Sequence, residues 1–280
     1  MFSQDHYYLA PAKINLFLHV LKRRHDGYHE LQTLFHLLNY GDELSFRVND
    51  LGVLALHKSN DPPSHQMPMD QNLIIEAANL LRDKTGKPSK GVDITVRKRL
   101  PLGAGLGGGS SNAGITLRAL NQLWNCNFSL TELSQISSQL GADVPLFVLG
   151  KSAWAEGIGE RLKAVRLESV WYLVITPNCS VSTAQIFSQE NLTRNSIAIK
   201  MADFLAGATR NDCESVTREL YPEVDEALTW LGRYAEARMT GTGSSVFAKF
   251  RNESDAQDVL EKTPSGMKGF VAQGINSLQI

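Results

Sequence analysis

Residues 101–114 read PLGAGLGGGSSNAG, and this glycine-rich stretch decides how the rest of the chain is interpreted. Glycine stands at positions 103, 105, 107, 108, 109 and 114, and two hydroxyls follow one another at Ser110 and Ser111. Because glycine loses the most conformational freedom on folding, such a cluster is typical of a loop whose bare backbone approaches a ligand. A helix that follows adds its positive dipole end, which attracts anions, usually phosphates. The stretch therefore predicts a nucleotide-binding loop.

Three kinds of nucleotide loop compete for this stretch. The Walker A pattern needs a lysine, and none occurs between residues 101 and 114. The dinucleotide pattern GxGxxG matches at Gly103, Gly105 and Gly108, but it should follow a strand that is apolar throughout, whereas residues 92–97 alternate. The dinucleotide pattern also needs an acidic residue about 20 residues after its glycines. Glu132 is near that distance, but it belongs to the capping box of a helix, so the dinucleotide pattern is not favoured. A lysine-free loop remains, in which backbone amides, the helix dipole, serine hydroxyls and a metal ion meet the charge of a triphosphate.

Strands and helices are mixed along the chain without regular alternation, which predicts an α+β fold with two lobes. We place the lobes at residues 1–155 and 156–280, and we expect an exposed loop at 58–71. Alternating stretches predict strands, and apolar residues at helical spacing predict helices. The expected strands are 92–97, 171–176 and one within 240–250; the expected helices are 72–82 capped by Asn72, 111–125 capped by its serines, 129–141 opened by a Ser129–Glu132 capping box, 198–205 and 222–234.

Composition narrows the class of protein. A formal net charge of −1 over 280 residues leaves no broad basic surface, so we expect no nucleic-acid partner. The longest apolar run, residues 170–175, is far shorter than a membrane span, so we expect no membrane attachment. The three cysteines, Cys126, Cys179 and Cys213, are odd in number and far apart, as is typical of a reducing compartment. We therefore expect a cytoplasmic enzyme or binding protein, as a monomer or a weak homodimer.

Two polar residues interrupt the apolar stretch at 11–18, and an aspartate follows the third expected helix. Lys13 and Asn15 share one face of the expected strand, where ordinary solvated side chains are the alternative to a functional role. Asp143 could be a general base for a substrate hydroxyl or a turn aspartate that binds local N–H groups. Phosphoryl transfer needs a residue that orients the nucleophile and a positive charge near the transferred group, which Asp143 and Lys13 would supply.

Two further stretches are candidates for a ligand pocket. Tyr28 and His29 follow the first strand, and we expect them to stack on or hydrogen-bond a base, with a surface loop as the alternative. His25 and His29 are four residues apart, but Gly27 between them argues against a helix, so no protein metal site is predicted. Residues 240–245, TGTGSS, form a second small-residue turn that either is a tight connection or lines the same cleft.

Together, residues 11–18 (PAKINLFL), 101–114 and 239–248 (MTGTGSSVFA) resemble the three motifs of the GHMP kinase superfamily, in the same order. Within it, residues 25–35 (HDGYHELQTLF), 71–74 (QNLI) and 141–148 (GADVPLFV) resemble the branch that phosphorylates the 2-hydroxyl of a cytidine-diphosphate-linked methylerythritol on the route to isoprenoids. The resemblance implies a ribosomal-S5-like first lobe, a ferredoxin-like second lobe and an active site between them. It also implies ATP as phosphoryl donor, Mg²⁺ as cofactor and a small cytidyl molecule as acceptor.

The resemblance further assigns roles to individual residues. Asp143 matches the catalytic base and Lys13 its electrostatic partner. The ATP loop corresponds to Pro101, Leu102, Gly103, Ala104, Gly105, Leu106, Gly107, Gly108, Gly109, Ser110 and Ser111. The cytidyl pocket corresponds to Asn15, Tyr28, His29, Thr183 and Phe187. A homoserine- or mevalonate-type kinase, a dinucleotide-dependent oxidoreductase and a nucleotide-binding regulator without turnover stay open as alternatives.

Overall fold

A computed structural model describes residues 7–58, 72–207 and 209–279. The strands are β1 (Tyr8–Arg23), β2 (His29–Asn49), β3 (Leu54–Lys58), β4 (Gly91–Arg97), β5 (Ala153–Gly157), β6 (Arg161–Ala164), β7 (Trp171–Pro177), β8 (Ala237–Met239), β9 (Val246–Phe250) and β10 (Met267–Ile275). The helices are α1 (Leu73–Thr85), α2 (Gly108–Leu123), α3 (Leu130–Ser137), α4 (Val144–Leu149), α5 (Thr183–Ser188), α6 (Met201–Leu205), α7 (Glu214–Leu220), α8 (Pro222–Leu231) and α9 (Glu253–Leu260).

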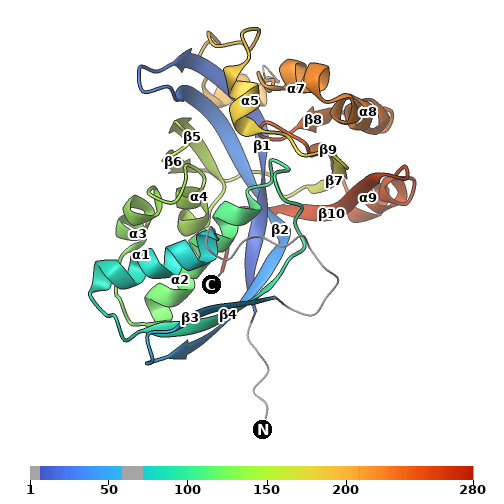
Figure 1. The fold of residues 1–280 in the computed structure, drawn as a ribbon. Helices are drawn as coiled ribbons and strands as arrows, with labels where there is room; N and C mark the ends of the chain where they lie inside the picture. The colour runs from blue at the N-terminus through green and yellow to red at the C-terminus, as the bar shows by residue number, and fades with distance from the viewer. Residues whose placement is uncertain (1–6, 59–71, 208, 280) are drawn as a thin grey trace.

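A long antiparallel hairpin, β1–β2, runs through both halves of the molecule (Figure 1). Its pairing extends from Tyr8 opposite Leu44 to Arg23 opposite His29, with register shifts along the way. These irregularities break the strict alternation expected of the first strand and let it face two different cores. Leu18 accordingly packs in the core of the second lobe.

The first lobe is built on the lower part of this hairpin. Strand β4 pairs antiparallel with β2 and parallel with β3, and β5 pairs with β2 farther along. Helices α1 to α4 lie together beside this sheet (Figure 1), with α2 packed between α1 and α4. Apolar side chains of the helices and of β2 and β4 form one core, which includes Leu44, Ile94, Leu117 and Trp124.

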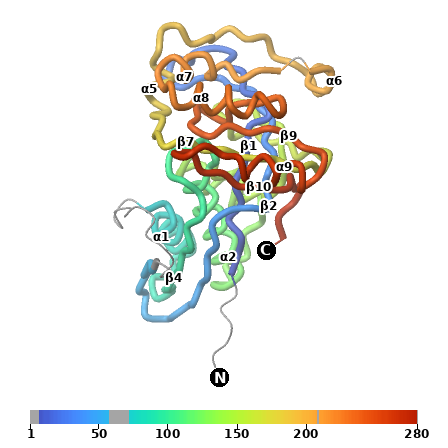
Figure 2. Tube along the Cα trace, turned by 90° about the vertical axis from the view of Figure 1, so that its right-hand side faces the viewer, coloured from blue at the N-terminus to red at the C-terminus, as the bar shows by residue number. Residues whose placement is uncertain are grey.

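The second lobe has the strand order β10–β7–β9–β8, with helices between β7 and β8 and between β9 and β10. This βαββαβ arrangement is the ferredoxin-like fold that the family resemblance implies. Strand β10 also pairs with β2, where Gly274 lies opposite Leu38, so one ten-stranded sheet joins the two lobes. The segment from α5 to α6 crosses the top of this lobe (Figure 2). The two-lobed α+β fold is thus confirmed.

Several local predictions agree with the structure. The Asn72 side chain caps α1 by accepting a hydrogen bond from the Ile74 amide, and the Ser129–Glu132 capping box opens α3. The predicted strands at 92–97 and 171–176 correspond to β4 and β7. The predicted helices at 198–205 and 222–234 are present but shorter, as α6 and α8.

Other local predictions are wrong or stay untested. Helix α2 begins at Gly108 with Gly107 as its N-cap, so Ser110 and Ser111 lie in its first turn and do not cap it. Helix α3 ends at Ser137 rather than at Gly141. The lobe boundary at 155/156 stays a prediction, and residues 59–71 of the expected loop lie outside the described residues. Among described residues, no helix has the length and apolar character needed to span a bilayer.

Asp42 on β2 fixes the segment that leads into the glycine loop. Its buried carboxylate accepts hydrogen bonds from the backbone amides of Arg99 (2.8 Å) and Leu100 (2.9 Å) and from the Asn112 side chain on α2 (3.0 Å). The Lys98 ammonium completes its shell as an ion pair. A buried carboxylate is stable only when it is paired and hydrogen-bonded, and here the partners are the entry and exit of the loop.

We expect Asp42→Ala to lower the free energy of unfolding by about 3–5 kcal/mol, because two backbone amides, an amide side chain and a lysine lose their common acceptor. Urea denaturation measures this loss. The control is Asp50→Ala, which removes a surface ion pair with Lys90 at 2.6 Å and should cost less than about 1 kcal/mol. Equal losses in the two variants would show that Asp42 does not hold the loop.

Candidate active site

Lys13 lies on β1, and its side chain is buried, with 4% of the residue exposed. The ammonium donates to Asn15 Oδ1 at 2.7 Å and lies 3.5 Å from Asp143 Oδ2. It also lies 5.2 Å from the centroid of the Phe35 ring. A solvated strand lysine, the alternative left open by the sequence, is therefore wrong. A buried cation of this kind needs a nearby negative charge, which Asp143 provides.

Asp143 is the residue before the first turn of α4, yet its carboxylate makes no capping hydrogen bond to that helix. The alternative of a turn aspartate that satisfies local N–H groups is therefore not what the structure shows. About a third of the side chain (32%) stays exposed. The carboxylate thus has a cation on one side and an open side toward solvent, the geometry that a general base needs.

A hydrogen-bond chain links this pair to the second small-residue turn. The Asn15 amide donates to Thr240 Oγ1 at 3.0 Å, and the Asn15 side chain donates to Thr33 Oγ1 at 2.9 Å. Thr240 in turn contacts the carbonyl of Gly105 at 3.3 Å, and the Ser245 amide donates to the Ala104 carbonyl at 3.1 Å. Turn 240–245 therefore lies directly against the glycine loop, which is the arrangement expected if the turn and the loop line the same cleft.

Two glycines of the loop are required by close contacts. Gly105 has φ +76°, and a Cβ there would lie 2.3 Å from the carbonyl oxygen of Thr240. Gly107 has φ +72°, and a Cβ there would lie 2.9 Å from the Phe147 ring and 3.2 Å from Lys13 Cγ. Only glycine combines this backbone conformation with so little space. The loop is therefore held against both Lys13 and the turn of the second lobe.

The remaining loop residues divide into anchors and accessible backbone. Ala104 and Leu106 are buried in the core between the lobes, while Pro101, Leu102 and Gly103 are exposed. Ser110 is half-buried in the first turn of α2, whereas Ser111 is fully buried and its Oγ has no hydrogen-bond partner among the described residues. The N-terminal amides of the 16-residue helix α2 lie at the end of this loop, as an anion site requires.

The predicted acceptor residues lie at the far end of the hairpin and on α5. The His29 and Phe187 rings stack with centroids 4.9 Å apart, and Thr183 Oγ1 lies 3.0 Å from Thr242 Oγ1. Tyr28 is 61% exposed. The structure therefore brings His29 and Phe187 together and leaves the Tyr28 ring open to solvent, while Asn15 lies apart from them, beside Lys13.

The His29 imidazole is kept neutral by its surroundings. Burial lowers its pKa, and the positive charges of Arg194 and Arg23 lower the pKa further. Arg194 Nε donates to His29 Nε2 at 3.1 Å. Because protonation is disfavoured in the folded state, the ring stays uncharged to a lower pH than an ordinary histidine.

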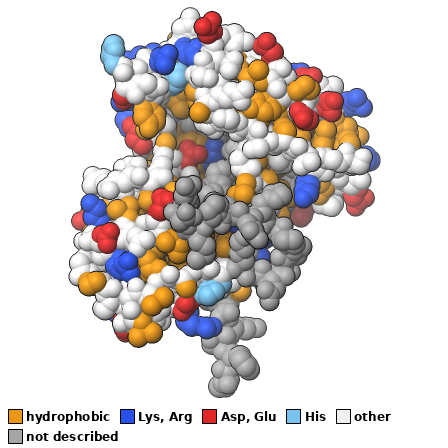
Figure 3. Space-filling view, in the orientation of Figure 1, with side chains coloured by type: hydrophobic (Ala, Val, Ile, Leu, Met, Phe, Trp, Pro, Cys, Tyr) orange, Lys and Arg blue, Asp and Glu red, His pale blue; other side chains and the backbone are white. Residues whose placement is uncertain are grey.

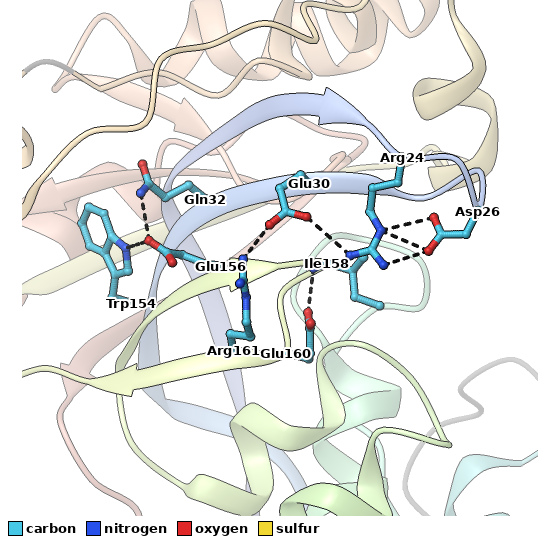
Figure 4. Close-up of polar contacts among 9 residues, drawn as sticks. All are labelled: Arg24, Asp26, Glu30, Gln32, Trp154, Glu156, Ile158, Glu160 and Arg161. Carbon is cyan, nitrogen blue, oxygen red and sulfur yellow. Dashed lines mark hydrogen bonds and ion pairs between the residues drawn. The ribbon is translucent and has the colours of Figure 1, made fainter.

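Polar contacts fix this end of the hairpin to β5 and β6 (Figure 4). Glu30 on β2 accepts from Arg161 at 2.5 Å and from Arg24 of the hairpin turn at 3.4 Å. Gln32 donates to Glu156 on β5 at 3.1 Å. Single exposed ion pairs contribute little to stability, but this connected set orients the hairpin tip relative to the first lobe.

The surface is hollowed between the two lobes, where acidic and basic side chains meet (Figure 3). A separate cavity of about 500 Å³ borders β1 and the segment after α5. It is lined by His19, Asn195, Ser196, Ile197, Ile199, Thr209 and Arg210. None of the predicted site residues lines that cavity, so it is distinct from the site around Lys13 and Asp143. No group of three or more His, Cys, Asp or Glu side chains in the described segments could hold a metal ion.

Sequence reasoning missed two residues that build the site. Asp42 belongs to none of the motifs of the sequence, and its burial and its hydrogen-bond donors are visible only in the structure. Arg194 lies in an irregular segment after α5 with no local pattern around it. Neither residue carried a signal in the sequence, because both act through contacts with distant parts of the chain.

Comparison with known proteins agrees with this architecture. Residues 72–151 match the GHMP kinases N terminal domain and residues 192–269 the GHMP kinases C terminal domain. A 4-diphosphocytidyl-2-C-methyl-D-erythritol kinase of Alkalilimnicola ehrlichii is 52% identical over 273 residues, covering 98% of this chain and 92% of that protein. The kinase of the same name from Marinobacter nauticus is 48% identical, covering 95% and 93%.

The chain belongs to the 4-diphosphocytidyl-2-C-methyl-D-erythritol kinase family. A crystal structure of 4-(cytidine 5′-diphospho)-2C-methyl-D-erythritol kinase superposes with a TM-score of 0.81 at 32% identity, covering 97% of this chain and all of that one. The mevalonate kinase of Methanococcus jannaschii superposes with a TM-score of 0.72 at 14% identity, over 99% of this chain and all of that one, which shows a shared fold alone. The chain is therefore a GHMP small-molecule kinase, a class of ATP-dependent enzymes, and the oxidoreductase alternative is wrong.

We expect Gly105→Ala to destabilise the protein by several kcal/mol, because the added Cβ combines a strained backbone with a clash against Thr240. The matched control is Gly86→Ala, where φ is +62° and nothing lies within 4 Å of a Cβ, so only about 1 kcal/mol of strain is added. Urea denaturation compares the two variants. Hydrogen exchange at the Ser245 amide should accelerate in Gly105→Ala alone; unchanged protection there would contradict the contact.

Proposed function

We propose that the protein transfers the γ-phosphoryl group of ATP to the 2-hydroxyl of 4-diphosphocytidyl-2-C-methyl-D-erythritol. The observation that carries this proposal is the Lys13–Asp143 pair, 3.5 Å apart and beside the glycine loop, in a chain 52% identical to a kinase of that name. The reaction belongs to the route to isoprenoid precursors. It needs an activated hydroxyl, a bound triphosphate and compensation of negative charge.

Asp143 is the proposed base. The substrate hydroxyl lies against its open side and gives up its proton to the carboxylate, while the hydroxyl oxygen attacks the γ-phosphorus and the bond to ADP breaks. The absence of a capping bond at Asp143 supports this role, because the carboxylate lone pairs are not engaged by helix amides. No covalent intermediate with the protein is required.

Lys13 is the proposed electrostatic partner. Its ammonium lies 3.5 Å from Asp143 Oδ2, balances the negative charge of that carboxylate and offers positive charge to the transferred phosphoryl group. Its hydrogen bond to Asn15 and its burial fix the ammonium in one place. Fixed charge in a partly dry site stabilises developing charge more than a mobile surface lysine would.

Residues Pro101 to Ser111 are the proposed ATP loop, with their backbone amides and the start of α2 directed at the phosphates. Mg²⁺, which screens phosphate charge when bound, fits this loop as an ion that arrives with ATP. Magnesium commonly takes most of its ligands from phosphates and water, and the loop offers the hydroxyl of Ser110 and the unpartnered hydroxyl of Ser111.

Asn15, Tyr28, His29, Thr183 and Phe187 are the proposed cytidyl-binding residues. The stacked His29 and Phe187 rings and the exposed Tyr28 ring support a pocket for a flat base. A small polyol or amino-acid substrate would not need such aromatics. The free, widely separated cysteines support the proposed cytoplasmic location.

A coupled ADP-release assay tests the function. We expect turnover with the cytidyl substrate and none above background with homoserine, mevalonate or galactose. Asp143→Asn should lower kcat by about 10²–10⁴-fold, because the base is lost, while ATP affinity stays within a fewfold of the unaltered enzyme. Faster turnover of another acceptor would overturn the substrate, and full activity of Asp143→Asn would overturn the base.

His29→Ala tests the acceptor pocket. We expect the KM for the cytidyl substrate to rise about tenfold or more, with the KM for ATP within about twofold, because His29 lies on the acceptor side only. Steady-state kinetics with each substrate varied in turn measures both constants. A parallel rise in the two values would show that His29 does not belong to a separate pocket.

A further inference from the structure

Arg194 connects the imidazole of His29 with the backbone of Phe187, the two residues whose rings stack in the proposed base pocket. It follows α5 in the extended segment that crosses the top of the second lobe, and its Nε donates to His29 Nε2 at 3.1 Å. Its Nη2 donates to the carbonyls of Phe187 (2.9 Å) and Gln189 (2.6 Å), and its Nη1 to those of Leu192 (3.2 Å) and Glu190 (3.4 Å). All five N–H donors of the guanidinium therefore have an acceptor.

This contact decides where the His29 proton lies. An arginine can only donate, so His29 Nε2 must be the unprotonated nitrogen of the ring. A neutral imidazole then carries its hydrogen on Nδ1. The described residues give Nδ1 no hydrogen-bond partner, and the stack with Phe187 fixes the plane of the ring. His29 thus presents a single N–H donor that is free for a ligand.

We propose that Arg194 is a positioning residue that fixes His29 as an Nδ1–H donor and thereby makes the pocket select cytosine over uracil. The inference rests on the proposed function. Cytosine offers an acceptor at N3, whereas uracil carries a hydrogen there. A fixed N–H donor that faces N3 therefore forms a hydrogen bond with cytosine. With uracil the same donor faces another N–H group, and no hydrogen bond forms. Sites that fix donors in this way reject the mismatched analogue strongly, because a buried polar group stays unpaired.

A purely structural role for Arg194 is the competing explanation, because four of its five hydrogen bonds go to backbone carbonyls in α5 and in the segment directly after it. The substitution Arg194→Lys distinguishes the positioning role from the structural role. Arg194→Lys keeps a positive donor for His29 Nε2 but cannot reach the same carbonyls together. It should therefore loosen the segment and keep the base preference. Arg194→Met removes both functions and frees the ring to place its hydrogen on either nitrogen.

The first experiment reads the tautomer directly in the unaltered protein. Long-range ¹H–¹⁵N NMR of ¹⁵N-histidine-labelled enzyme, with His29→Gln to assign the signal, distinguishes the Nδ1–H from the Nε2–H form. We expect the Nδ1–H form at neutral pH, and an Nε2–H form would overturn the proposal. This measurement needs no substrate, so it determines the tautomer even if the enzyme turns over no cytidyl compound. Absence of that turnover would contradict the proposed function but not the assignment of the tautomer.

The second experiment measures kcat/KM for the cytidyl substrate and for its uridyl analogue. We expect the cytidyl-to-uridyl ratio to fall at least about tenfold in Arg194→Met and to stay within about threefold in Arg194→Lys. The control is Arg23→Met, which removes an exposed charge near His29 without breaking a hydrogen bond and should also keep the ratio. A ratio retained in Arg194→Met, or lost equally in the lysine variant, would refute the tautomer role.

Discussion

The buried ammonium of Lys13 is the constraint around which the rest of the molecule is arranged. A cation removed from water is tolerated only beside fixed acceptors, and Asn15 and Asp143 supply them from β1 and from the start of α4. The bare Gly107 packs on the lysine stem, and Asn15 leads on to Thr240 in the other lobe. One desolvated charge thus sets the relative positions of the strand, the loop, the helix and the second lobe.

Local structure was predictable where short-range physics decides it. The Asn72 cap, the Ser129–Glu132 box and the alternating strand β4 each satisfy their own backbone within a few residues. The glycine spacing around Gly105 likewise predicts a loop, and the binding of a ligand by that loop stays a prediction. The residues that matched the kinase motifs then placed Lys13 and Asp143 as partners, and the structure brings them to 3.5 Å.

What the sequence could not supply depends on distant contacts. The 21-residue strand β2 is not among the strands that the sequence predicts, and its register shifts against β1 follow from packing on two cores. Asp42 and Arg194 look like ordinary surface charges in the sequence. Asp42 binds amides and Arg194 binds an imidazole that lie far away along the chain, and no local sequence pattern indicates such contacts.

The pairing of β10 with β2 has a consequence for how the protein is made. Strand β10 lies far along the chain from β2, yet it completes the second-lobe sheet and joins that sheet to the first hairpin. Leu18 and Val20 of that hairpin also belong to the core of the second lobe. During synthesis, β1 and β2 emerge before β10, and their apolar faces stay uncovered until β10 has also left the ribosome. Chaperone demand should therefore concentrate on this hairpin, the part of the chain that later carries the buried lysine.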